Sequence, residues 1–194
     1  MEEPARRSTA ERIRDAAVAL LSEQGVVRTT TRGIAARAGV NEVTVFRHFS
    51  SKTGVLAAAL QHVTAPFRAA VAAPSEDVVA DLRQAVAGYL AFADAHPDLV
   101  SRVLPEIAHE PELREHILPW QQGVAARVRA VVEHHQARGA LRADLSADEV
   151  ARSLLGPLAA RASLRHLFPV HGPLDVATYV AAFLEGHRGG VQHD

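Results

Sequence analysis

Hydrophobic residues recur with helical spacing along the whole chain, and no stretch alternates with the two-residue period of a strand. The first stripe places apolar residues three and four positions apart: Ile13, Ala17, Leu20 and Leu21, with Gln24 continuing the same face. Ser8 or Thr9 can cap this helix, and Gly25 is placed to end it. The pattern predicts a helix over 9–24 and an all-α protein.

Shorter helices are expected next. Thr29–Thr31 opens one that Gly39 ends, Asn41 caps another over 42–49, and Ser50-Ser51 caps a third over 52–65. Pro66 and Pro74 mark the passage to a second region, so we expect two domains, over 1–62 and 63–194. Prolines lie at first-turn positions of four of the six later helices. The six are expected over these ranges: 76–95, 97–108, 111–118, 119–138, 147–168 and 173–187.

Composition narrows the class of protein. The chain is 48% hydrophobic and 22% charged, enough to bury a core, and no apolar run reaches the roughly 18 residues of a membrane span. The absence of cysteine excludes disulfides, thiolate zinc sites and a cysteine nucleophile. The charged N-terminus lacks the apolar stretch of a signal peptide. We therefore expect a cytoplasmic protein.

Charge is distributed unevenly. Residues 1–62 hold nine Lys/Arg and six Asp/Glu, a net charge of +3, whereas the other 132 residues hold twelve and sixteen, a net charge of −4. This asymmetry favours a polyanion-binding segment joined to another functional region. The one lysine in the chain, Lys52, lies in the basic part.

The segment 30–52 carries the most specific pattern, two short helices separated by a turn around Gly39. An outward face on a helix of two turns suits the major groove, where Arg47 can bridge guanine, and Val43 and the Thr44 methyl can touch thymine methyls. Thr30 and Lys52 begin helices and point donors towards phosphate. An ordinary helical hairpin with a solvated face is the alternative. The candidate DNA-binding residues are Thr30, Asn41, Glu42, Val43, Thr44, Arg47, His48 and Lys52.

From Thr9 to about His62 the chain resembles the N-terminal domain of TetR-family transcriptional regulators. The matching residues are Thr30, Ile34, Ala35, Ala38, Gly39, Val40, Thr44, His48, Phe49 and Lys52. The resemblance implies a three-helix DNA-binding head, a larger all-helical ligand-binding region and a homodimer. It also implies that Thr44, His48 and Lys52 meet the DNA backbone.

Three positions depart from the family pattern. Phe46 stands where tyrosine is common, so a phosphate hydrogen bond should be missing. Val43 stands where glycine is frequent, which adds bulk next to the bases. Gly33 replaces an acidic residue, so a capping box with Thr30 loses its reciprocal partner. The first two departures bear on affinity and on the operator sequence.

Beyond residue 62 the pattern is less specific. From the resemblance we expect the last two helices to form a dimer interface with two apolar stripes: Leu154, Leu158, Val176, Val180, Phe183 and Leu184. A small-molecule cavity would lie among the middle helices, with mixed apolar and polar candidates: Tyr89, Phe92, Glu106, His109, His116, Trp120 and Arg161. The eleven histidines lack metal-ligand spacing, so no metal and no cofactor are expected.

These features predict a ligand-responsive DNA-binding transcriptional regulator. We expect a repressor that a small molecule releases from a near-palindromic operator. A family member that activates transcription, or a helical dimer without DNA binding, is the alternative. An enzyme using His109, Glu110 or Asp148 lacks the supporting Ser-His-Asp or metal spacing, so no catalytic residue is assigned.

Overall fold

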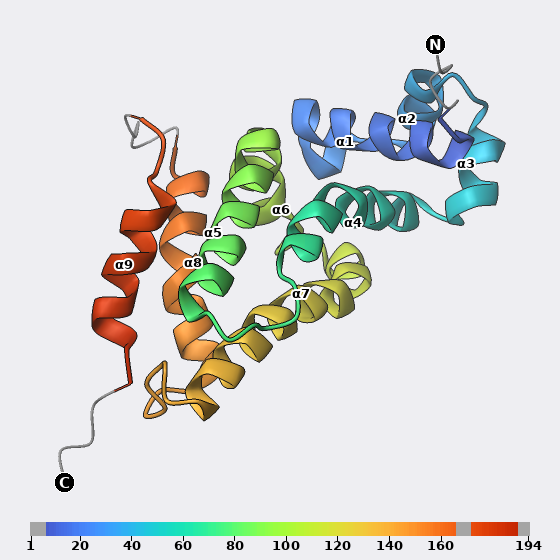
Figure 1. Ribbon diagram of the computed structural model, residues 1–194. Helices are drawn as coiled ribbons and strands as arrows, with labels where there is room; N and C mark the ends of the chain where they lie inside the picture. Colours follow the sequence, from blue (N-terminus) through green and yellow to red (C-terminus); the bar gives the residue numbers. More distant parts are fainter. Residues whose placement is uncertain (1–6, 166–171, 190–194) are drawn as a thin grey trace, which may run out of the picture. The chain divides into compact units, whose positions relative to one another are not determined.

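The computed structural model describes residues 7–165 and 172–189, and every regular element within those ranges is helical (Figure 1). The all-α fold class predicted from the sequence is confirmed. The elements, in chain order, are α1 (Thr9–Arg28), α2 (Thr31–Ala38), α3 (Glu42–Phe49), α4 (Lys52–Ala70), α5 (Val78–Ala95), the π-helical turn η1 (Leu99–Val103), α6 (Leu104–Ile107), α7 (Pro111–Ala137), α8 (Ala147–Ser163) and α9 (Val176–His187).

The chain folds into two compact units. The first unit runs to Thr64 and resumes over Asp98–Trp120, and the second comprises Ala65–Pro97 and the chain from Gln121 onward. The first unit therefore joins the N-terminal helices to η1, α6 and the beginning of α7. None of the described helices is long and apolar enough to cross a membrane.

Helix α1 organises the first unit. Ser8 and Glu11 form a capping box at its start: the Ser8 hydroxyl accepts from the Glu11 amide, and the Glu11 carboxylate accepts from the Ser8 amide at 2.7 Å. The predicted apolar stripe is confirmed, because Ile13, Ala17 and Leu21 are fully buried. α1 packs against α2, η1 and α6.

The end of α1 differs from the prediction. Gly25 leaves the helical conformation, with φ 80° and ψ −177°, but the chain then makes another helical turn to Arg28. A carboxylate far along the sequence stabilises this second start, because the Val26 amide donates to Glu106 at 2.7 Å. The break at Gly25 was readable from the sequence, whereas the extra turn depends on that distant contact.

Prolines end fewer helices than predicted. α4 continues through Pro66 to Ala70, and α7 runs from Pro111 to Ala137 through Pro119, where the sequence predicted two helices. Proline already has a helical φ and removes one donor, so tertiary packing can hold a helix through it. The predicted helix 97–108 is divided between η1 and α6. α8 ends at Ser163, and residues 166–168 of its prediction lie outside the described residues.

The second unit is built around α5, which packs against α8 and α9 (Figure 1). Polar groups distant in sequence connect its helices. The Tyr179 hydroxyl donates to the Leu154 carbonyl at 2.6 Å, which links α9 to α8. His135 of α7 is fully buried and lies 2.8 Å from the Asp81 carboxylate of α5. These bonds satisfy polar groups inside the bundle.

Candidate nucleic-acid interface

Local capping defines the two helices of the central motif. The Thr30 hydroxyl accepts from the Gly33 amide at 3.1 Å and so begins α2. Asn41 begins α3 by accepting from the Thr44 amide at 3.2 Å and from its hydroxyl at 2.7 Å. Gly39 ends α2 with φ 65° and ψ 41°, a left-handed conformation that glycine adopts without steric cost. The predicted caps and the turn are confirmed.

The inner side of the motif packs into the first unit. Ile34, Ala35 and Val45 are buried, as the pattern predicted. Arg12 of α1 donates to the carbonyls of Ala38 and Gly39, where α2 has no intrahelical partners left. Sequence reasoning missed Arg12, because no local pattern links it to a turn 26 residues away.

The outer side of α3 exposes side chains of several kinds. Val43 is 76% exposed and Phe46 is 45% exposed, while Arg47 and His48 are exposed beside them. Within the described residues Arg47 makes no hydrogen bond and no ion pair, so its guanidinium is available to an external acceptor. This face can offer donors and apolar contacts to the edges of bases.

Glu42 has an internal partner. Its carboxylate accepts from the hydroxyl of Thr31, the first residue of α2, and its side chain is half-buried. This bond joins the starts of α2 and α3 and orients Glu42. Thr31 was absent from the predicted site, and the eleven-residue separation of the pair gives no periodic signal in the sequence.

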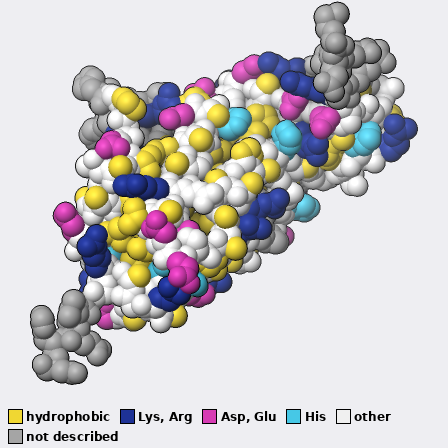
Figure 2. All heavy atoms as spheres, viewed as in Figure 1, with side chains coloured by type: hydrophobic (Ala, Val, Ile, Leu, Met, Phe, Trp, Pro, Cys, Tyr) yellow, Lys and Arg dark blue, Asp and Glu magenta, His cyan; other side chains and the backbone are white. Residues whose placement is uncertain are grey.

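Lys52 lies at the beginning of α4, as predicted. Its ammonium group is 3.4 Å from the Val27 carbonyl, so it is held near the end of α1 by a single long hydrogen bond. On the face drawn in Figure 2, basic and acidic side chains are interspersed. The long basic side chains that the candidate interface can offer as donors are thus Arg47 on α3 and Lys52 at the start of α4.

The expected ligand-contacting residues fall in both units. In the second unit, Tyr89 and Phe92 of α5 have ring centroids 6.4 Å apart, and Phe67 packs edge-on against Tyr89 at 5.6 Å. Burial raises the pKa of Tyr89 to about 12, so its hydroxyl stays protonated at neutral pH and can act as a donor. Tyr89 and Phe92 thus belong to one aromatic cluster.

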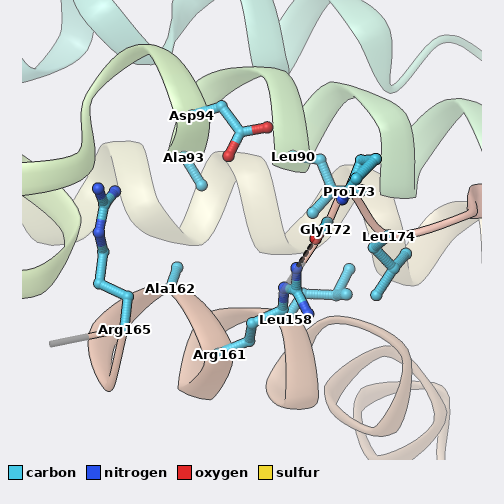
Figure 3. A pocket seen from close by; sticks show the side chains of 10 residues that line it. All are labelled: Leu90, Ala93, Asp94, Leu158, Arg161, Ala162, Arg165, Gly172, Pro173 and Leu174. Carbon is cyan, nitrogen blue, oxygen red and sulfur yellow. Dashed lines mark hydrogen bonds between the residues drawn. The ribbon is translucent and has the colours of Figure 1, made fainter. Parts of the chain in front are cut away.

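Arg161 lines a different feature of the second unit, a cavity of about 350 Å³ between α5, α8 and the segment before α9 (Figure 3). Its guanidinium donates to the Gly172 carbonyl at 2.9 Å. Asp94 and Arg165 supply further charges, and Leu90, Leu158 and Leu174 supply apolar surface. The cavity can hold a small molecule with apolar and polar parts.

The remaining expected ligand contacts lie in the first unit. Glu106 accepts from Val26, His109 follows α6, and His116 is an exposed residue of α7 whose ring nitrogen lies 2.9 Å from the Glu112 carbonyl. Trp120 belongs to α7, and its side chain lies outside the described residues. Within the described ranges, no group of three His, Asp or Glu side chains is placed to hold a metal ion.

Most of the expected dimer residues are buried within their own chain. Val176 is half-buried, and the other five are at most 8% exposed within the single chain: Leu154, Leu158, Val180, Phe183 and Leu184. These side chains pack inside their own chain and offer little surface to a partner. The exposed face of α9 instead carries Thr178, Ala181, Ala182 and Glu185, which are spaced three and four residues apart.

Capped α2, the Gly39 turn and solvent-facing α3 define a helix-turn-helix protein. Residues 13–59 match the bacterial regulatory proteins of the tetR family, and residues 72–176 match the tetracyclin repressor-like C-terminal domain. The second match covers more than half of the chain. The chain belongs to the TetR family of regulators.

Individual proteins show the same likeness. An uncharacterized HTH-type transcriptional regulator, YvkB of Bacillus subtilis (strain 168), is 30% identical over 118 residues, which cover 61% of this chain and 62% of that protein. The match thus spans less than two thirds of that relative's length.

Two solved structures share the fold. The fatty acid degradation regulator FadR of Bacillus halodurans has a TM-score of 0.71 at 20% identity and full coverage of both chains. FadR of Bacillus subtilis in complex with stearoyl-CoA has a TM-score of 0.70 at 17% identity, covering 90% and 95% of the two chains.

Proposed function

We propose that this chain is a ligand-responsive, sequence-specific DNA-binding repressor, with a DNA-binding head over 1–62 and a ligand-binding and dimerisation region over 63–194. The solvent-facing side of α3 is the observation that carries this proposal. It places an unpaired Arg47 beside exposed apolar and polar side chains on a helix capped at both ends. A cytoplasmic location and the lack of a catalytic role are part of the same proposal.

Residue roles follow from geometry and family pattern. Arg47 reads guanine, because its fork matches the two acceptors of that base. Thr44 and His48 of α3 and Lys52 of α4 contact phosphates, and Thr30 and Asn41 begin α2 and α3. Glu42 and Val43 face the bases.

Selection of bound DNA from a random pool by the full chain tests the proposal. We expect a near-palindromic site whose half-sites are spaced by one or more helical turns. Arg47→Ala should cost about 1–3 kcal/mol on that site and relax preference at one base pair in each half. Lys52→Ala should weaken binding to all sequences and reduce the salt slope by about one. Arg83→Ala, an exposed arginine of α5, is the matched control.

The outcomes separate the alternatives. If the pool yields no enriched sequence, the chain is a helical protein without specific DNA binding. If a site is bound and a reporter behind it becomes more active, the regulator is an activator. An Arg47→Ala variant that keeps full base preference would show that Arg47 contacts the DNA backbone and does not read a base.

The dimer is proposed to form through the exposed faces of α8 and α9. Small residues there, such as Gly156, Ala160, Ala181 and Ala182, allow two helices to approach closely. Ala182→Arg should shift the chain towards monomer in sedimentation, whereas Ala125→Arg, on an exposed face of α7, should not. A dimer of unchanged strength in the first variant would place the interface elsewhere.

The ligand is proposed to bind in the second unit, at the α5–α8 cavity or near the aromatic cluster of Tyr89 and Phe92. Because one protein of the same fold was solved with stearoyl-CoA, a long-chain acyl-CoA is the first probe. Binding should raise the melting temperature and weaken operator affinity by a reciprocal factor. Stabilisation by the acyl-CoA without any change in operator affinity would contradict the regulatory link.

A further inference from the structure

The outer face of α3 carries two exposed apolar side chains. Val43 is 76% exposed and Phe46 is 45% exposed, so both present apolar surface to solvent. Val45 anchors the helix from the opposite side, where it is fully buried. Residues three apart on a helix lie on the same face, with Cβ atoms roughly 5–6 Å from one another. Val43 and Phe46 therefore form one small apolar surface, which we name the α3 apolar pair.

The surroundings of this pair indicate its occupant. Arg47 follows directly and lies four residues from Val43 on the same face, and exposed His48 and half-buried Thr44 complete a polar rim. Two side chains supply far less surface than the roughly 800 Å² per partner of a stable protein interface. The pair is also continuous with the proposed DNA-reading surface. The apolar group presented by base edges in the major groove is the 5-methyl of thymine.

We propose that the α3 apolar pair reads thymine methyl groups, so that each operator half-site holds thymines beside the base pair contacted by Arg47. This inference rests on the proposed DNA-binding function and specifies its target. Positions 43 and 46 are separated by about 4.5 Å along the helix axis. Base pairs are stacked roughly 3.4 Å apart. The two side chains are thus close enough to meet methyls on neighbouring base pairs.

Deoxyuridine substitution tests this reading without changing the protein. Uracil pairs as thymine does and lacks only the 5-methyl group, so each contacted position should lose about fourfold in affinity. Replacing the contacted thymine in both half-sites should weaken binding by the full chain roughly fifteenfold. Thymines outside the contacted positions, replaced in the same duplex, are the control for altered DNA shape.

Protein variants assign the contacts. In Val43→Ala the deoxyuridine penalty should disappear at one thymine position, and in Phe46→Ala at the other, because the methyl has already lost its partner. Arg47→Ala should keep both penalties while losing preference at guanine. These exposed positions leave the core intact, and circular dichroism of each variant checks the helical content.

The results distinguish two failures. An enriched operator that binds equally well with thymine or deoxyuridine at every position overturns the methyl reading and leaves the proposed function intact. An operator whose half-sites lack thymine next to the Arg47-dependent base pair has the same meaning. A pool without any enriched sequence overturns both. Penalties that persist unchanged in Val43→Ala and Phe46→Ala would assign the methyl contacts to other side chains.

Discussion

The α2–α3 motif and the second unit are both helical, but different ranges of sequence hold them together. In the motif, the capping hydrogen bonds span three residues, Thr30 with Gly33 and Asn41 with Thr44, although Arg12 of α1 also bonds the turn from 26 residues away. In the second unit, the Asp81–His135 bond spans 54 residues and the Arg127–Val71 bond spans 56. Caps and turn residues therefore shape the motif locally, whereas the second unit depends on packing between distant segments.

This difference has a functional consequence. In the proposed function, α3 must present the same face to every operator half-site, and the short-range cap at Asn41 sets where this helix begins. The proposed ligand-binding region is under a different constraint, because its cavity must fit a small molecule. Its helices are joined by hydrogen bonds between distant segments.

The largest effect should come from the buried pair of the second unit. Asp81→Ala leaves fully buried His135 without its partner, which should lower the free energy of unfolding by about 3–5 kcal/mol. Urea unfolding measures this loss, with Asp94→Ala as control, because Asp94 is an exposed carboxylate of the same helix. A loss below about 1 kcal/mol would mean that the second unit does not depend on this bond.

The same pair predicts a pH dependence. Burial raises the pKa of Asp81, but hydrogen bonds from His135 and Ser75 outweigh burial and hold the pKa below its ordinary value of 3.8. A carboxyl group whose pKa is lower in the folded than in the unfolded chain stabilises the fold at pH values above its unfolded pKa. This stability is lost as the pH falls through its folded pKa. The stability difference between parent and Asp81→Asn should therefore shrink below about pH 4. A difference that grows there would reverse the assignment.

A smaller effect is expected at Gly25. Unlike the caps of the α2–α3 motif, this part of the first unit depends on a residue about 80 positions away. At φ 80° and ψ −177° a side chain is strained, and a Cβ would lie 2.6 Å from the Glu106 carboxylate. Gly25→Ala should therefore lower stability by about 1–3 kcal/mol. Gly123→Ala should be neutral or stabilising, because Gly123 lies in the middle of α7 and an added Cβ would meet no atom within 4 Å. Equal responses in thermal unfolding would show that the Gly25 conformation is not needed.

The smallest effect should come from the cap of α3. Asn41→Ala removes the acceptor for the Thr44 amide and should cost about 1 kcal/mol. Asn41→Ser keeps a capping oxygen and should retain most of the stability. Amide hydrogen exchange of α3 locates the loss. If exchange speeds up throughout the first unit but not in α3 specifically, the structure of the motif depends on more than its local caps.

The sequence by itself determined the helical class and most of the α2–α3 motif. Thr30, Gly39 and Asn41 each act within a few residues, so their roles can be recognised without knowledge of the fold. The outward positions of Val43, Arg47 and His48 follow from helical period once the buried face is known. The hydrogen bonds of Arg12 and Thr31 could not be predicted, because their partners lie 26 and 11 residues away.

Only the tertiary structure decided how prolines, distant carboxylates and apolar stripes are used. Pro66 and Pro119 lie inside helices because packing outweighs one lost hydrogen bond. Glu106, a candidate ligand contact by sequence, supports the turn after Gly25. The stripe through Leu154 and Phe183 is buried within the chain, since periodicity shows that a face is apolar but not which surface covers it. That choice rests on contacts between segments far apart in the sequence.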